Sequence, residues 1–180
     1  MSRLASLAVL AVLVTGCGGN DPLQALDDPS QGATIGLNLP VDQNAIQSVT
    51  AYSSSQPYIG MTYVGSFTGV SQVVTAPAAG LVVNVDNSVN PGYYAVTIYH
   101  NARISSQLRF LQAPSVRQGD YVNPGDVIAT IPSSAFGLTG VGLSVYVDGN
   151  SVASCPFSFL SQAARTAYVN HFGGAFPCLN

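Results

Sequence analysis

The chain of 180 residues contains no lysine, no glutamate and no tryptophan, and only 7% of its residues are charged. Nucleic-acid binding depends on clustered Lys and Arg side chains, because these neutralise phosphates. Here five arginines stand against eight aspartates, which gives a net charge of −3. We therefore expect no nucleic-acid partner. Solubility must depend on Ser, Asn, Gln and Thr instead, which suits an exported protein.

Histidine is also scarce, since His100 and His171 are the only two in the chain. Tetrahedral zinc sites need four Cys, His or carboxylate ligands, and the Cys155/Cys178 pair has no His-rich run beside it. A Ser-His-Asp triad can be imagined, but no Gly-x-Ser-x-Gly motif supports it. We predict no cofactor, a structural place for His100 at a strand end, and a helix C-terminal cap for His171.

The N-terminal segment is typical of an export signal. Residues 4–14 follow Arg3 and are almost entirely apolar, yet eleven residues are too few to span the ~30 Å hydrocarbon core. Residues 14–17, Val-Thr-Gly-Cys, resemble the bacterial lipobox, which implies that Cys17 becomes lipidated. By the same resemblance to bacterial lipoproteins, Gly18 in place of Asp after that cysteine implies the outer membrane. An ordinary secretory signal followed by a chance cysteine is the alternative.

The predicted organisation follows from this reading. Residues 1–16 form a lipoprotein signal peptide and residues 17–36 a lipidated flexible tether, so the mature protein is a periplasmic lipoprotein that meets the membrane through its lipid anchor. The two remaining cysteines, Cys155 and Cys178, are then predicted to form a disulfide in the oxidising periplasm. Such a bridge contributes roughly 3 kcal/mol.

The central part of the chain has a β pattern. Short runs rich in Val, Ile, Tyr and Thr alternate with Gly, Pro, Asn and Asp, and turns are expected at Pro124-Gly125 and Asp148-Gly149. A helix is predicted for residues 162–170 after the cap Ser161. The expected fold is a mainly β, antiparallel domain at residues 37–160, followed by a short helix and a disulfide-pinned coil at 161–180. The predicted strands are 48–52, 61–64, 73–75, 80–86, 94–100, 106–111, 127–131, 142–147 and 151–153.

Two sequence motifs, here called phrases, are more specific than the general β pattern. The first, residues 74–85, contains Ala76-Pro77 and Gly80, and the second, residues 116–131, contains Gly119-Asp120. Biotinyl and lipoyl domains place two such phrases closer together and need a lysine. The longer spacing resembles that of the lysostaphin-type (LytM-like) zinc endopeptidases, which cut peptidoglycan cross-links. The resemblance implies a duplicated hybrid motif, a barrel-sandwich-like β fold.

The zinc ligands of that family do not carry over to this chain. The family binds zinc through two His and one Asp, and further His residues act on the attacking water. By the resemblance, the first ligand motif falls on Met61 and Gly65, the His-x-His motif on Gly142 and Ser144, and a further catalytic His on Phe110. The resemblance therefore implies a degenerate, non-catalytic groove lined by these five residues.

Degenerate members of the family act as regulators, so the resemblance implies binding to peptidoglycan or to a cell-wall hydrolase. A structural or assembly envelope lipoprotein with a hybrid β fold is one alternative. A zinc peptidoglycan endopeptidase with atypical ligands is another. Several aromatic side chains fit either a sugar-binding groove or ordinary core and strand-face packing. These are Tyr52, Tyr58, Tyr63, Phe67, Tyr93, Tyr94 and Tyr99.

Overall fold

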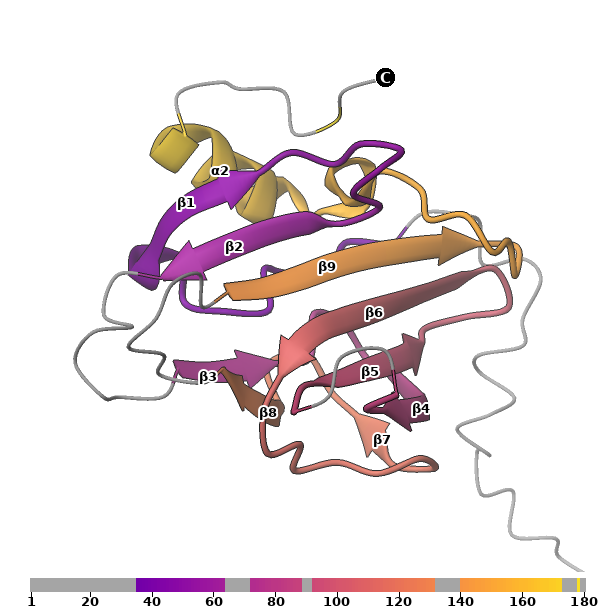
Figure 1. Ribbon diagram of the computed structural model, residues 1–180. Coiled ribbons are helices and arrows are strands. Elements are labelled where there is room, and N and C mark those ends of the chain that lie inside the picture. The colour runs from indigo at the N-terminus through magenta and orange to yellow at the C-terminus, as the bar shows by residue number, and fades with distance from the viewer. Residues whose placement is uncertain (1–34, 64–71, 89–91, 132–139, 173–177, 179–180) are drawn as a thin grey trace, which may run out of the picture.

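The computed structural model describes residues 35–63, 72–88, 92–131, 140–172 and 178. Its described part contains two antiparallel sheets and one short C-terminal α-helix, which confirms the predicted mainly β fold (Figure 1). Gly65, one of the five predicted groove residues, lies outside the described residues, as do Cys17 and the predicted signal peptide.

The larger sheet has seven strands in the order β1-β2-β9-β6-β5-β4-β7, and every neighbouring pair is antiparallel. In that order the strands are Ile46–Thr50, Ile59–Tyr63, Gly140–Val147, Ile104–Leu111, Tyr94–Tyr99, Gly80–Asp86 and Tyr121–Val122. The smaller sheet pairs β3 (Gln72–Thr75) with β8 (Val127–Ile131). Strands β4 and β8 have the bounds that the sequence predicts.

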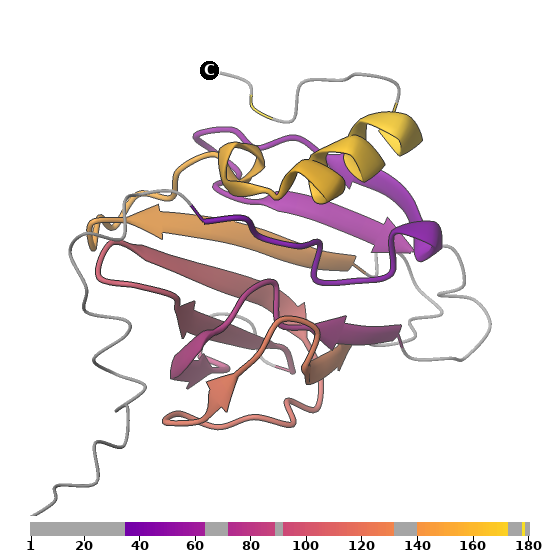
Figure 2. The ribbon, with the colours of Figure 1, turned by 180° about the vertical axis from the view of Figure 1, so that it is seen from behind.

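In the part of the chain that the structure describes, one face of the larger sheet is covered by helices and by the smaller sheet, and the other face is covered by neither. The small sheet, the segment that begins at Ile35, the 3-10 helices η1 (Gln43–Ala45) and η2 (Pro156–Phe159), and helix α2 (Gln162–Phe172) all lie on one side (Figure 2). Figure 1 looks onto the opposite face, over which no described helix or strand passes.

The core lies between the larger sheet and these covering segments. Strand β9 shows the cause, because successive side chains of a strand point to opposite faces. Its residues Val141, Leu143 and Val145 are at most 1% exposed and belong to one hydrophobic cluster. Leu37 from the N-terminal segment and Ile128 from the small sheet complete that cluster from the covered side.

Helix α2 closes the covered side. Ser161 caps it, since the Ala164 backbone N–H donates to Ser161 Oγ at 3.2 Å. The buried Tyr168 packs edge-to-face on Phe157 at a centroid distance of 5.4 Å, and burial raises the pKa of Tyr168 to about 12. Within the described residues, no helix has the length and apolar character needed to cross a bilayer.

The predicted strand at residues 151–153 is wrong. Asp148 and Gly149 both have positive φ, 54° and 68°, and the Asn150 N–H donates to the Val147 carbonyl at 3.0 Å. This is the geometry of a type I′ hairpin turn. The chain after the turn returns as bends, and it pairs only once, through a bridge from Ser154 to Val145.

Candidate functional site

The opposite face of the large sheet is polar because of the same alternation that builds the core. Gly142, Ser144 and Tyr146 alternate with the apolar residues of β9. Arg109 of β6 pairs with Gly142 and Gln107 pairs with Ser144, so their side chains share one face. We call this surface the polar face. It comprises Thr97, Gln107, Arg109, Gly142, Ser144 and Tyr146.

Three of the five predicted groove residues meet here, namely Phe110, Gly142 and Ser144. Met61 does not, and its predicted place in the groove is corrected. It is 1% exposed in the core, where its ladder partner is Val141. Strand β2 presents Gly60 to the polar face instead, because Gly60 pairs with Gly142. A shift of one residue along a strand moves a side chain to the other face.

The ring of Tyr58 fills the space above this glycine pair. A Cβ atom on Gly142 would lie 2.9 Å from Tyr58 Cδ2 and 3.2 Å from Phe110 Cε2. Real Cβ atoms do not approach other heavy atoms at 2.9 Å, so a larger residue at position 142 would have to displace the ring. The bare backbone of Gly142 is therefore what allows Tyr58 to rest on the sheet.

Ser144 is closed off by the same stretch of chain. Its side chain is fully buried, and its hydroxyl donates to the Pro57 carbonyl at 2.8 Å. Pro57 and Tyr58 are the last residues of the connection between β1 and β2. This connection thus covers both positions on which the sequence resemblance places the His-x-His motif.

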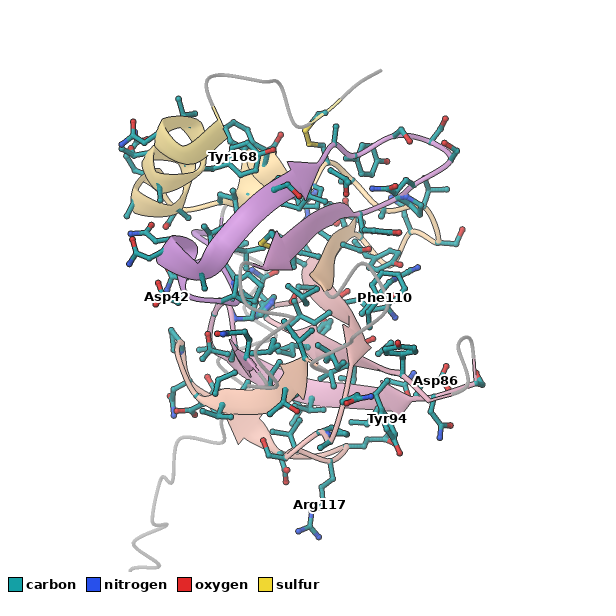
Figure 3. The ribbon with its side chains drawn as sticks, turned by 60° about the vertical axis from the view of Figure 1, so that its left-hand side comes forward. Asp42, Asp86, Tyr94, Phe110, Arg117 and Tyr168 are labelled. Carbon is teal, nitrogen blue, oxygen red and sulfur yellow. A yellow bond between two sulfur atoms is a disulfide. The ribbon has the colours of Figure 1, made fainter. Side chains whose placement is uncertain are left out.

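Phe110 reaches this cluster through an irregularity in β6. Its φ of 65° lies in the left-handed region, which phenylalanine rarely adopts. The pairing with β5 shifts here, from Val96–Leu108 to Tyr94–Leu111, which is a β-bulge. The bulge directs the ring onto Tyr58, edge-to-face at 5.5 Å. In Figure 3 Phe110 lies on the side of the sheet away from helix α2 and Tyr168.

Arg109 is the charged group of the polar face, and a network of neutral partners holds it. Its Nε donates to Gln107 Oε1 at 2.7 Å and its Nη2 to Tyr146 Oη at 2.9 Å. Gln107 in turn donates to Thr97 Oγ1 at 3.2 Å. The guanidinium carbon lies 5.9 Å from the centroid of the Tyr58 ring, within cation–π distance.

The donor set at this face does not fit a zinc ion. Gly142 and Phe110 offer no ligand atom, and the hydroxyl of Ser144 is engaged by Pro57. Within the described residues no three His, Cys, Asp or Glu side chains come together. The guanidinium of Arg109 adds a positive charge, which opposes a divalent cation.

His100 lies elsewhere, buried at the end of β5, in the structural place predicted for it. A carbonyl cannot donate, so Nδ1 carries the proton and donates to Ala79 O at 2.7 Å. The Ser106 hydroxyl then donates to Nε2 at 2.8 Å. Burial lowers the pKa of His100 below its ordinary value of 6.5. The side chain of His171, which is predicted to cap the helix C-terminus, lies outside the described residues.

A disulfide joins Cys155, which directly precedes η2, to Cys178, which bridges to Tyr52. Next to helix α2 is an open groove of 690 Å³, between this helix and the N-terminal segment. Asn38, Gln43, Gln162 and Asn170 contribute to its walls, but no charged or aromatic side chain does. This groove can accept polar ligands, but it holds no group able to activate water.

Sequence reasoning missed the network around Arg109 and the covering role of Tyr58. The network had a signal, because Gln107 and Arg109 alternate with apolar neighbours in β6, as Ser144 and Tyr146 do in β9. Tyr58 had none beyond its aromatic character, since its contact with Gly142 joins positions far apart in the chain.

Comparisons with known proteins indicate the family and the fold of this chain. The sequence model for Peptidase family M23 matches residues 64–154, about half of the chain. No curated protein sequence matches the chain.

Three solved structures illustrate the shared fold. A chain of the SpoIIQ–SpoIIIAH pore-forming complex is 22% identical, with a TM-score of 0.55 over 72% of this chain and 94% of its own. Lysostaphin, the antimicrobial peptidase from Staphylococcus simulans, is 19% identical, with a TM-score of 0.56 over 79% of this chain and 58% of its own. The M23 metalloprotease pseudoalterin is 16% identical, with a TM-score of 0.52 over 68% and 76%.

Proposed function

The chain belongs to peptidase family M23, and from this premise we propose that it is a non-catalytic member that binds peptidoglycan at the bacterial cell envelope. One observation carries the proposal. The positions on which the resemblance places the zinc-binding His-x-His motif are Gly142 and Ser144, and Pro57 and Tyr58 cover both of them.

Hydrolysis of a peptide bond by this family depends on a water molecule that zinc activates. A sheet that offers glycine, a buried hydroxyl and an arginine at this place supplies no such water. Binding of a ligand requires no activated water, because shape, backbone groups and a few polar side chains suffice. The accessible part of the polar face retains hydrogen-bonding groups, namely the half-buried Gln107, Arg109 and Tyr146.

A protein partner is the second candidate, and a specific comparison favours it. One structural relative comes from a complex of SpoIIQ with SpoIIIAH, so a chain with this fold is found in a protein assembly. On this alternative the partner is a cell-wall hydrolase that the polar face regulates.

The proposal includes the place of the protein in the cell. We propose that Cys17 carries a lipid that anchors the chain in the outer membrane, facing the periplasm. Cys17→Ser should then move the protein from the membrane fraction to the soluble periplasmic fraction, as followed by fractionation and immunoblotting. Continued sedimentation of this variant with membranes in high salt would contradict the anchor, whereas Cys155→Ser should leave the distribution unchanged.

The binding proposal is tested with purified sacculi. The full chain, purified in detergent, should sediment with sacculi and should release no muropeptides, with or without added zinc. Tyr146→Ala should weaken sedimentation, while Tyr121→Ala should not, since Tyr121 is an exposed tyrosine on the distant edge strand β7. Zinc-dependent release that a chelator abolishes would reject the proposal. Binding that is indifferent to both substitutions would favour the groove beside α2.

A further inference from the structure

The half-buried Arg109 has no acidic partner among the described residues, although its surroundings hold it in a fixed position. Among the described residues the only ion pair joins Arg103 to Asp148. The other described aspartates accept hydrogen bonds within their own turns. These aspartates and their donors are Asp42 with Asn44, Asp86 with Ser88, Asp120 with the Arg117 backbone and Asp126 with Asn123. None of these carboxylates forms an ion pair with Arg109.

The guanidinium of Arg109 has further N–H donors that are not engaged within the described residues. Nε and Nη2 each donate once to a neutral partner, and within the described part of the chain Nη1 has no hydrogen-bond partner. A guanidinium has five N–H groups in a planar fork that matches a carboxylate. Gln107 and Tyr146 fix the plane of this fork, so little side-chain entropy is lost when an anion binds.

The surface beside the fork is formed by two aromatic rings. The rings of Tyr58 and Phe110, both partly buried, cover the backbone of Gly142, which lies opposite Arg109 in the ladder. The accessible edges of these rings accept a methyl group more readily than a charged side chain. A charge-assisted hydrogen bond beside apolar groups is also stronger than one in open water.

We propose that Arg109 is the centre of a carboxylate-binding site, and that its ligand is the free C-terminal carboxylate of a peptide ending in a small apolar residue. Arg109 pairs with Gly142, a position on which the sequence resemblance places a zinc ligand. The inference deepens the proposed function and depends on it, since a peptidoglycan stem peptide that is not cross-linked ends in alanine and offers this chemistry.

The test compares matched small probes by chemical-shift titration of the full chain in detergent. Acetyl-D-Ala-D-Ala should bind, and its C-terminal amide should bind about tenfold more weakly or worse, because a hydrogen bond to an ionised group is roughly twice as strong as a neutral one. Arg109→Gln should reduce acid binding to the level of the amide. Arg117→Gln, an exposed loop arginine, should leave it unchanged. Arg109→Lys keeps the charge without the fork and should give an intermediate affinity.

Several results would overturn the proposal. Equal binding of the acid and the amide would exclude carboxylate recognition, as would full acid binding by Arg109→Gln. Stronger binding of acetyl-Asp-amide would assign the carboxylate to a protein side chain rather than to a peptide terminus. If Arg109→Gln does not fold, screening of acid binding by salt in the natural protein serves as the second measurement, and insensitivity to salt would contradict the site.

Sedimentation with sacculi separates the two proposals. If the Arg109→Gln variant sediments as well as the natural protein, the carboxylate site is wrong and the proposed function stands. If the acid probe binds through Arg109 but the protein does not sediment with sacculi, the site stands and the proposed function is wrong.

Discussion

The two faces of the seven-stranded sheet are built from the same strands and differ in what holds them. On the covered face, Val141, Leu143 and Val145 of β9 pack into one continuous apolar cluster. On the polar face, the intervening residues Gly142 and Ser144 are held by a single connection, residues 51–58, through one hydrogen bond and the ring of Tyr58.

This difference shows how one face of a sheet can maintain the fold while the other face carries polar side chains. The covered face specifies the fold, because apolar burial of about 25 cal/mol per Å² accumulates over many side chains there. The polar face contributes little to that total, so its residues are free to change.

The largest change in the free energy of unfolding is expected when one residue of each face is substituted at adjacent positions of β9. Leu143→Ala should lower the free energy of unfolding by about 2–5 kcal/mol, because a fully buried leucine leaves a cavity. Ser144→Ala should cost only about 1 kcal/mol, the loss of its hydrogen bond to Pro57. Urea denaturation of both variants measures the difference. Equal losses would contradict a division of roles between the faces.

The disulfide is expected to have the next largest effect, confined to the covered side. Cys178→Ser should lower the free energy of unfolding by roughly 3 kcal/mol through the entropy of the unfolded chain, since the bridged cysteines are 23 residues apart. Thermal denaturation gives the loss. The affinity of the polar face for acetyl-D-Ala-D-Ala should not change. Full maleimide labelling of the unfolded, non-reduced natural protein would show that the bridge is absent.

A smaller effect is expected on the polar face itself. Gly142→Ala should cost about 1–3 kcal/mol, because its Cβ atom meets the Tyr58 ring in a packed cluster. The cost should shrink in a Tyr58→Ala background, where the ring is gone. A double-mutant cycle measures this coupling. Additive losses would mean that the ring does not rest on Gly142 in solution.

The sequence predicted the covered face better than the polar face. The turn glycines of the second phrase behave as their sequence suggests. Gly125 has a φ of 89°, and the Asp126 N–H donates to the Asn123 carbonyl at 3.1 Å, which is a type II turn. Local preferences decide such elements, so the bounds of β4 and β8 follow from their flanking glycine and aspartate residues.

The errors occur where distant segments decide the outcome. Residues 48–52 are predicted as a strand, yet β1 is Ile46–Thr50, because Tyr52 bridges to Cys178 and donates its hydroxyl to the Ala153 carbonyl. Met61 is a different kind of error. Because Met61 alternates with Ile59 along the strand, the local pattern already places its side chain in the core. The prediction relied instead on alignment through the distant Ala76-Pro77 motif, which placed Met61 in the groove. The left-handed φ of Phe110 has no sequence signal, since phenylalanine rarely adopts it.

The smallest effect concerns a histidine that belongs to the covered face. His100 is buried and neutral, and its folded-state pKa lies below 6.5. Its contribution to stability is therefore complete above pH 6.5 and is lost as the pH falls toward the folded-state pKa, because the unfolded chain binds the proton first. We expect the free energy of unfolding to fall as the pH drops below 6.5, with a slope of at most about 1.4 kcal/mol per pH unit.

His100→Gln should flatten this slope, whereas His171→Gln should keep it. The lowered pKa values of Asp86 and Asp148 act in another window, since their ordinary value is 3.8 and the stability they contribute is lost only at lower pH. Urea titrations at each pH measure all three proteins. A slope that survives in His100→Gln would assign the proton uptake to another group. A flat profile in the natural protein would mean that the imidazole is not held neutral between Ala79 and Ser106, and the covered face would then contain no pH-sensitive element in this window.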